Sequence, residues 1–188
     1  MIYAGIGSRR TPPEFLTLMS KLGFRLAHQC HTCRSGHAVG ADQAFELGAS
    51  EAISRGSATP SQLEVYLPWS TYNADVSHLG LTFNPEPAAF KVADEYIKKA
   101  HPAYNKLSHG AKKLHGRNVF QALGGTFDKP VDFVVCWTPD GAETLEQLSS
   151  ETGGTSTAIR ISIENGAKVF NLYHEDSIIC LKNFIGVE

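Results

Sequence analysis

The chain has 188 residues, a length that fits one domain and can bury a core without disulfides or metal ions. Hydrophobic residues make up 42% of the sequence and charged residues 19%, which excludes a disordered or fibrous chain. The formal net charge of −2 argues against a protein that depends on non-specific phosphate contacts alone.

The sequence shows no targeting or membrane signal. No stretch approaches the roughly 18 apolar residues of a membrane span. The first residues run directly into a predicted strand, without a basic lead or a cleavable apolar segment. Four cysteines without a secretory signal indicate a reducing compartment. We therefore expect a cytoplasmic protein.

The first half of the chain alternates short apolar runs with amphipathic stretches. Residues 2–6 predict a buried strand that ends in GIGSRR. Pro12 and Pro13 then open a helix, with Thr11 as its candidate cap. A weaker strand over residues 31–34 ends at SGHAVGAD, and a helix follows from about residue 41 to 54.

The middle of the chain continues this pattern around one long interruption. Residues 63–67 predict a third strand, which ends at Pro68 and Trp69. Residues 70–87 are expected to form an irregular loop of the kind that is often functional. Two helical stretches follow, around residues 88–100 and 106–123.

The last third of the chain predicts two further strands and defines the fold class. They span residues 131–136 and 167–172, on either side of a helix over residues 155–165, and a short helix closes the chain. Strands separated by helices predict a parallel sheet covered on both faces. We therefore expect an α/β fold: one Rossmann-like three-layer domain over residues 1–188, with a mainly parallel sheet of about five strands.

Glycine-rich turns follow several of the predicted strands. We name residues 5–10 (GIGSRR) the first glycine turn, residues 35–42 (SGHAVGAD) the second, and residues 153–155 (GGT) the third. Open α/β sheets bind ligands at the carboxyl ends of their strands, and a glycine turn that opens a helix presents N–H groups to an anion. Together the three turns indicate a phosphate site, although each alone is equally consistent with a tight turn or a helix cap.

The turns do not match common nucleotide motifs. The first glycine turn lacks the third glycine of GxGxxG, and no acid for a ribose follows about twenty residues later. No GK[ST] follows either, so a Walker loop is excluded. NAD binding and ATP hydrolysis are therefore poor hypotheses, and no cofactor is assigned beyond a nucleotide or nucleotide-derived ligand.

Charged and aromatic side chains near the strand ends are candidates for ligand contacts. Arg9 and Arg117 could pair with phosphate, although Arg117 is also consistent with a surface ion pair. Trp69 and Trp137 could stack on a base or belong to the core. Asp42 could accept from a ribose hydroxyl or cap a helix. The residues predicted to contact the ligand are Gly7, Ser8, Arg9, Ser35, Gly36, Ala38, Gly40, Asp42, Trp69, Arg117, Asn118, Trp137, Thr138, Gly153, Gly154 and Thr155.

The sequence gives little support for a metal site or for a catalytic nucleophile. Residues 28–37 contain histidines and cysteines, but a single CxxC is a weak zinc signal, and an extended strand sends alternate side chains to opposite faces. No GxSxG elbow is present, and the glycine turns carry no pair of acids for glycosidic chemistry. We predict no metal site and assign no catalytic residue.

The order of these motifs resembles DprA/Smf proteins and the wider SLOG superfamily, which also includes the LOG-type phosphoribohydrolases. The second glycine turn matches the DprA pattern SGxAxGxD at Ser35, Gly36, Ala38, Gly40 and Asp42, and Arg117 and Asn118 match a later RN pair. The resemblance covers nearly the whole chain and is closest to the short, single-domain proteins carried by phages. It implies a Rossmann-like fold, a pocket for nucleotides or single-stranded DNA, and a homo-oligomer.

Two departures from these families bear on function. DprA proteins use a basic surface for DNA, whereas this chain is slightly acidic overall; only residues 91–117, with seven Lys/Arg and two acids, are strongly basic. LOG enzymes carry a catalytic Glu in the motif PGGxGTxxE, and that position is Ala158 here. Glu14, Glu46 and Glu143 are conceivable substitutes, but their spacing does not distinguish them.

The sequence is consistent with three functions. The first is binding of a nucleotide or nucleotide-derived phosphorylated small molecule in a glycine-rich pocket, to sense or sequester it. The second is DprA-like binding of single-stranded DNA in recombination, which residues 91–117 favour. The third is hydrolysis of a nucleotide N-glycosidic bond, which Ala158 disfavours. The small size, the net charge and the convergence of the turns place pocket binding first, and a non-enzymatic role above an enzymatic one.

Overall fold

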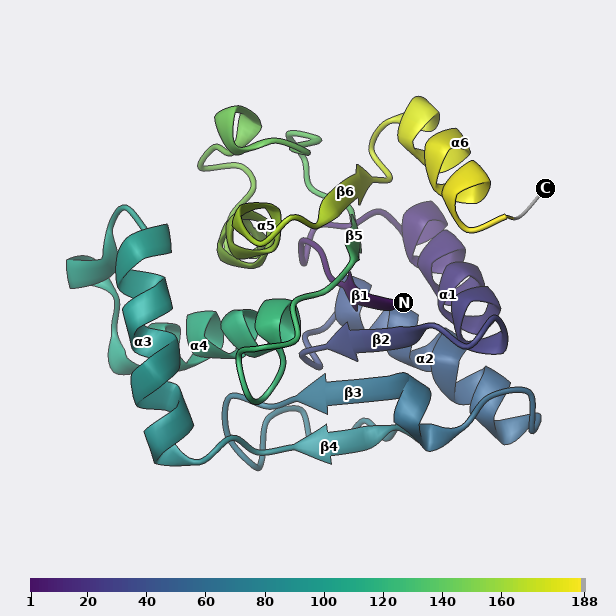
Figure 1. Ribbon diagram of the computed structural model, residues 1–188, viewed down its shortest axis with the longest axis horizontal. Coiled ribbons are helices and arrows are strands. Elements are labelled where there is room, and N and C mark those ends of the chain that lie inside the picture. Colours follow the sequence, from purple (N-terminus) through teal and green to yellow (C-terminus); the bar gives the residue numbers. More distant parts are fainter. Residues whose placement is uncertain (187–188) are drawn as a thin grey trace.

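A computed structural model describes residues 1–186 and shows an α/β fold of three layers, with a parallel sheet between two layers of helices (Figure 1). The strands are β1 (Ile2–Gly5), β2 (Thr32–Ser35), β3 (Leu63–Tyr66), β4 (Leu81–Phe83), β5 (Phe133–Cys136) and β6 (Lys168–Asn171). The helices are α1 (Pro13–His28), α2 (Ala41–Ser54), α3 (Pro87–Ala100), α4 (His109–Leu123), α5 (Thr155–Glu164) and α6 (Glu175–Phe184).

The sheet has the order β4-β3-β2-β1-β5-β6, and every neighbouring pair of strands is parallel. The chain first builds outward from β1 to β4 and then returns to the other side of β1 with β5 and β6. This reversal places a topological switch point between β1 and β5, where Ala4 pairs with Val134. Crevices at such points, outside the carboxyl ends of the strands, are the usual ligand sites of open α/β sheets.

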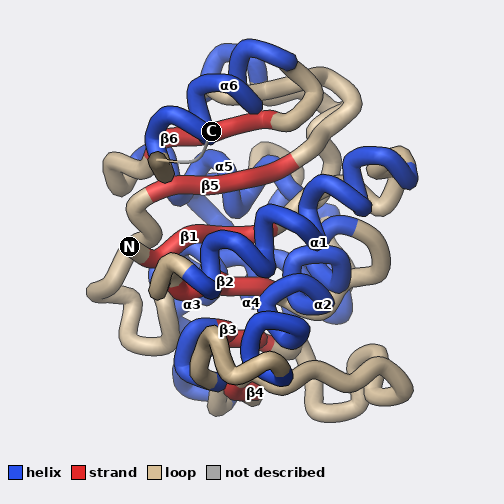
Figure 2. The backbone as a smooth tube through the Cα atoms, turned by 90° about the vertical axis from the view of Figure 1, so that its right-hand side faces the viewer, coloured by secondary structure: helices blue, strands red, loops and turns tan. Residues whose placement is uncertain are grey.

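Successive side chains of each strand point to opposite faces of the sheet and so divide the core into two layers. Tyr3 and Phe133 face a cluster formed with α1, α2 and α6, whereas Ala4 and Val134 face a cluster formed with α5. Helices α3 and α4 pack on that second side, around Phe120. Figure 2 shows α1, α2 and α6 together on one face of the sheet. Because both faces are covered, β5 is a continuous apolar run, FVVC, that is buried along its whole length.

Two features of the fold differ from the sequence predictions. The sheet has six strands rather than about five, because β4 forms inside the predicted loop and pairs with the edge of β3. Thr11 does not cap α1: Pro12 occupies the cap position, and the Thr11 hydroxyl donates to the Ser8 carbonyl. Within residues 1–186, none of the helices has both the length and the apolar character that crossing a membrane requires.

Candidate functional site

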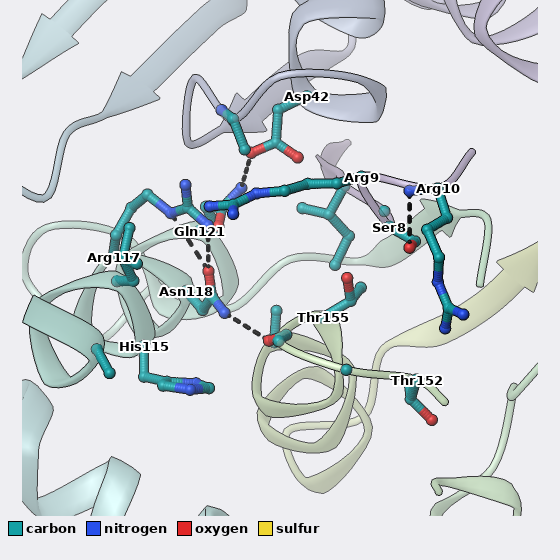
Figure 3. A pocket seen from close by; sticks show the side chains of 18 of the residues that line it. Ser8, Arg9, Arg10, Asp42, His115, Arg117, Asn118, Gln121, Thr152 and Thr155 are labelled. Carbon is teal, nitrogen blue, oxygen red and sulfur yellow. Dashed lines mark hydrogen bonds between the residues drawn. The ribbon is translucent and has the colours of Figure 1, made fainter. Parts of the chain in front are cut away.

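A cavity of about 380 Å³ opens at the carboxyl edge of the sheet, beside the switch point between β1 and β5 (Figure 3). This volume is in the range of small-molecule sites. We call it the glycine pocket. Segments distant in sequence line it: Ile6, Gly7, Ser8, Arg9, Arg10, Ala38, Asp42, Ala111, Leu114, His115, Arg117, Asn118, Gln121, Glu151, Thr152, Gly153, Gly154, Thr155 and Ala158.

The first glycine turn forms one wall of the pocket. Its backbone packs tightly against the start of α2 and the residue that follows β5. A Cβ atom at Gly7 would lie 2.7 Å from the Cβ of Ala41 and 3.1 Å from the carbonyl oxygen of Trp137. Only glycine fits this gap without displacing one of them. The Ser8 amide donates to the same Trp137 carbonyl over 3.0 Å, which fixes the turn to the end of β5.

Two helices begin at the pocket without a side-chain cap. Helix α2 starts after Gly40, whose φ of 99° requires glycine, and α5 starts after Gly154. Within the described residues, the amides of Gly7, Gly154 and Thr155 have no hydrogen-bond acceptor. Free N–H groups at a helix N-terminus attract anions through their orientation and through the helix dipole.

Arginines supply the positive charge of the pocket. The Arg9 side chain extends across it toward Gln121 in Figure 3, and no ion pair of Arg9 occurs among residues 1–186. Arg10 pairs with Glu151 over 2.8 Å, and both side chains are more than half exposed. Exposed pairs of this kind contribute little to stability, so an anionic ligand can compete for Arg10 at small cost.

Arg117 and Asn118 form a buried network that joins α4 to two of the glycine turns. Arg117 donates to the Gly36 carbonyl over 2.9 Å and to the Asn118 side-chain oxygen over 2.8 Å. The Asn118 amide donates to the Gly154 carbonyl over 2.8 Å. This network holds the guanidinium in one orientation, which is the preorganisation that anion binding needs.

Asp42 contributes a buried carboxyl group to the lining of the pocket. One of its oxygens accepts from the amide of Gly36 over 3.1 Å and from the side chain of Gln121 over 3.3 Å. Burial raises the pKa of Asp42 from 3.8 to about 6, and the positive charge of Arg117 opposes that rise. The group can therefore accept or donate a hydrogen bond near neutral pH.

His115 is a polar group of the pocket that stays uncharged. Its Nδ1 lies 2.8 Å from the Thr157 hydroxyl oxygen. Burial lowers the pKa of His115 to about 4, with smaller contributions from the nearby charges of His101 and Arg117. At neutral pH it can hydrogen-bond a ligand but adds no positive charge for a phosphate.

Ten of the sixteen predicted ligand contacts line the glycine pocket: Gly7, Ser8, Arg9, Ala38, Asp42, Arg117, Asn118, Gly153, Gly154 and Thr155. The structure places the other six elsewhere. Ser35 and Thr138 are fully buried and bonded to protein groups, and Trp137 is 8% exposed and packs in the core. Gly36 and Gly40 shape the second turn, and Trp69 lines a different cavity.

Sequence reasoning missed several residues that line the pocket. Arg10 belongs to the first glycine turn, and its neighbour Arg9 could have suggested it. His115 and Gln121 lie on the same face of α4 as Arg117 and Asn118, at helical spacing from them. Glu151 and Thr152 precede the third glycine turn.

The acids considered as replacements for a catalytic Glu lie outside the pocket. Ala158 lines it but carries no acid. Glu46 is buried against Ser35, and Glu143 accepts hydrogen bonds from the end of β6 and from α6. Glu14 lies in the first turn of α1. The acids among the lining residues are Asp42 and Glu151.

A second cavity, of about 770 Å³, lies between the end of β3 and helices α3 and α4. We call it the lysine groove. Trp69 and Phe90 supply aromatic walls, and the indole of Trp69 is partly exposed. The basic residues that line it are Lys91, Lys98, His109, Lys112 and Lys113. Within residues 1–186, no cluster of three or more metal-ligating side chains occurs.

Comparisons with known proteins give one structural similarity. No family model matches the sequence, and no curated protein matches it. Among solved structures, the chain is similar to DNA processing protein A from Helicobacter pylori, whose structure was described for its single-stranded DNA binding mode. The two are 16% identical with a TM-score of 0.41, over 97% of this chain and 81% of the other.

Proposed function

We propose that the glycine pocket binds a phosphate-bearing, nucleotide-type small molecule. The observation that carries the proposal is the convergence of three glycine turns and two uncapped helix N-termini on one cavity that also contains Arg9, Arg10 and Arg117. Backbone N–H groups and guanidinium groups are common phosphate donors in proteins.

The other polar groups of the pocket suit the remainder of a nucleotide. Asp42 and Gln121 offer hydrogen bonds to sugar hydroxyls, and neutral His115 offers a hydrogen bond to a base or a sugar. Binding, rather than turnover, is the better-supported role because Ala158 occupies the position where LOG enzymes carry their acid.

Calorimetric titration of wild-type protein with a panel of nucleoside mono- and diphosphates tests this proposal. Replacing Arg117 by Ala should weaken binding by about tenfold or more, since it removes a preorganised charged donor. The matched control is Arg25→Ala, on the exposed surface of α1. An affinity unchanged by Arg117→Ala would remove this residue from the site. Release of base or ribose phosphate during the titration would instead support the enzymatic alternative.

Single-stranded DNA binding is the second candidate, and the lysine groove favours it. Trp69 could stack on a base while Lys91 and Lys113 approach the backbone phosphates. A DNA strand held by several phosphate contacts should lose affinity steeply with salt, with a logarithmic slope near −0.7 per phosphate. A small molecule in the glycine pocket should respond much less. Native mass spectrometry of the purified protein would report any bound nucleotide and test the expected homo-oligomer.

A further inference from the structure

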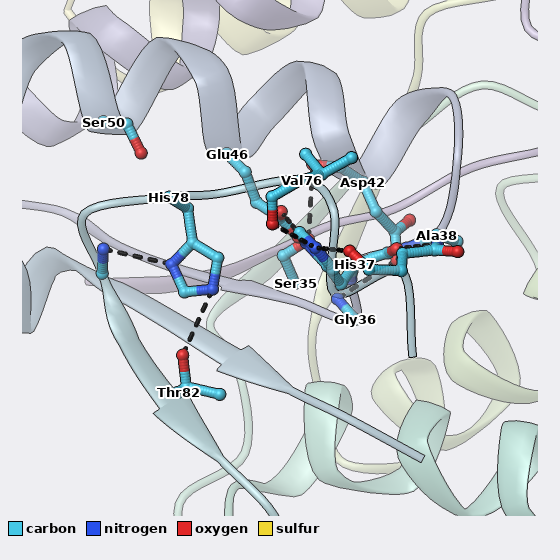
Figure 4. Close-up of polar contacts among 12 residues, drawn as sticks. Ser35, Gly36, His37, Ala38, Asp42, Glu46, Ser50, Val76, His78 and Thr82 are labelled. Carbon is cyan, nitrogen blue, oxygen red and sulfur yellow. Dashed lines mark hydrogen bonds and ion pairs between the residues drawn. The ribbon is translucent and has the colours of Figure 1, made fainter. Parts of the chain in front are cut away.

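A buried polar cluster surrounds His37 of the second glycine turn, and neither His37 nor Glu46 lines the glycine pocket (Figure 4). His37 is at its centre, and its side chain is 3% exposed. Glu46 of α2 lies on one side of the imidazole ring, and the loop that follows β3 lies on the other. The cluster therefore joins α2, the second turn and the loop.

Hydrogen-bond acceptors face both nitrogens of the His37 ring. Nδ1 lies 2.5 Å from a carboxylate oxygen of Glu46. Nε2 lies 3.1 Å from the carbonyl oxygens of both Asn73 and Val76. A neutral imidazole has one N–H donor, so it can satisfy only one of these two sides. With Glu46 ionised, only the doubly protonated ring donates a hydrogen bond on both sides.

The backbone on both sides of this contact is strained and mutually supported. His37 has φ 61° and Asn73 has φ 48°, both in the left-handed region that non-glycine residues rarely adopt. The Asn73 side chain donates to the His37 carbonyl over 2.7 Å. Conformations of this kind persist only where surrounding contacts hold them, so loss of the His37 bonds should release the loop.

The charged and titratable groups around His37 favour its protonated form. From α2, Glu46 contacts the ring directly, and Asp42 accepts from the amides of Gly36 and Ala38 on either side of it. The hydrogen bond to Glu46 raises the pKa of His37 above 6.5, and burial opposes it.

Two further groups, from the loop and from α4, lie near His37. His78 of the loop has its ring centroid 5.4 Å away, and burial lowers the pKa of His78, so it does not compete as a cation. From α4, Arg117 donates to the carbonyl of Gly36, the residue before His37.

The loop held by His37 also reaches the wall of the glycine pocket. The Arg117 guanidinium lies 5.9 Å from the centre of the Tyr72 ring, a cation–π contact. Tyr72 immediately precedes Asn73, whose carbonyl accepts from His37. Arg117 therefore contacts both segments that His37 joins, the second turn and the loop, so the protonation state of His37 can affect the position of Arg117.

We propose that His37 is a proton-dependent positioning residue. With both nitrogens protonated it holds residues 72–76 against the second glycine turn and keeps Tyr72 over Arg117. When the ring loses one proton to solvent, the Glu46 carboxylate keeps the hydrogen on Nδ1, so that the lone pair of Nε2 faces the two loop carbonyls and the loop separates. Since the pKa of His37 is raised in the folded chain, the loop is closed below that pKa and opens as the pH rises through it.

Hydrogen exchange of the loop amides, corrected for intrinsic rates and measured from about pH 5.5 to 8.5, tests the proposal without any ligand. Exchange at Val76 should accelerate by about tenfold or more across the His37 titration, because a charge-assisted hydrogen bond is lost. His37→Asn keeps a side chain that tolerates positive φ and should give fast exchange that is independent of pH. The control, His28→Asn on the exposed end of α1, should behave as wild type.

Imidazole ¹⁵N spectra of the wild-type protein report the protonation of His37 directly and do not depend on the folding of a variant. Below the His37 midpoint, both of its nitrogens should show the protonated signature, and that midpoint should lie above 6.5 and coincide with loop opening. A neutral His37 at pH 6, or corrected loop exchange that does not change through its titration, would overturn the proposal. Because no ligand is used, failure here is distinguishable from failure of the glycine pocket to bind nucleotides.

Discussion

Asp42 illustrates how a single residue couples the fold to the site. Its carboxyl group is buried beneath the second glycine turn, where it accepts from Gly36 and Gln121. The sequence presented Asp42 as either a helix cap or a ligand contact. The structure shows a third arrangement, because the carboxylate supports the turn that precedes α2 while it also lines the pocket. Sequence patterns reveal the residue type and not the direction of its side chain, so these alternatives could not be separated beforehand.

Replacing Asp42 by Asn should change how stability depends on pH. Because the pKa of Asp42 is raised from 3.8 to about 6, the folded chain favours its protonated form. Stability from this group is complete below about pH 4 and is lost as the pH rises through about 6. Relative to wild type, Asp42→Asn should therefore gain up to about 3 kcal/mol between pH 4 and 7.

Urea unfolding of both proteins at these two pH values measures this gain. The comparison of the two proteins cancels groups that titrate in both. A stability difference that is the same at both pH values would show that Asp42 ionises as freely in the folded chain as in the unfolded one.

A side chain at Gly36 should displace Arg117, which occupies the adjoining space. A Cβ at Gly36 would lie 2.5 Å from Cδ and Nε of Arg117. The arginine is the more adaptable partner, so Gly36→Ala should displace the guanidinium and weaken nucleotide binding by about tenfold. Calorimetric titration checks this, with Gly110→Ala as control, since no atom lies within 4 Å of that Cβ. Equal affinities for the two variants would contradict the assignment of Arg117 to the site.

At the level of elements, the spacing of apolar residues and the positions of glycine and proline predicted most of the fold. The strands around residues 2–6, 63–67 and 131–136 are confirmed as β1, β3 and β5, and the helix over 41–54 is confirmed as α2. Strand β4 was missed because it has three residues, all of them exposed, and therefore no buried alternation to detect. Helix α4 begins at His109 rather than near residue 106 because the Ser108 hydroxyl accepts from Ala111 and caps it.

The crossing of α1 and α2 should be the most sensitive contact between elements to added volume. A Cβ at Gly48 would lie 1.8 Å from the Ser20 carbonyl oxygen, and one at Gly23 would lie 2.5 Å from the Phe45 carbonyl oxygen. Both obstacles are backbone atoms and cannot rotate away. Gly48→Ala should therefore destabilise the protein by at least about 1–3 kcal/mol.

Gly110→Ala is the matched control for this prediction, because it places the same methyl group in open space at the exposed start of α4. That change should be neutral or stabilising by up to about 1 kcal/mol. Denaturant unfolding of the two variants measures both effects. Equal stabilities would mean that the two helices can separate at no cost.

At the level of the whole molecule, the strand order brings the site together. Residues 7, 42, 118 and 154 are far apart in sequence and line one cavity because the order of the parallel strands reverses at β1. The sequence predicted that glycine turns would lie at the carboxyl edge of the sheet. His115 and Gln121 were missed although they lie at helical spacing from the predicted contacts Arg117 and Asn118. The sequence could not predict that the Trp137 side chain packs in the core.

Amide chemical-shift mapping during titration with a nucleoside monophosphate tests most directly whether the glycine pocket is the ligand site. Saturable shifts are expected at Gly7, Gly154 and Thr155, whose amides are free in the described part of the chain, and at the side chain of Arg117. The lysine groove around Trp69 should shift little. Shifts confined to that groove, or the absence of saturable shifts at the three turns across a panel of nucleotides, would contradict nucleotide binding in the glycine pocket.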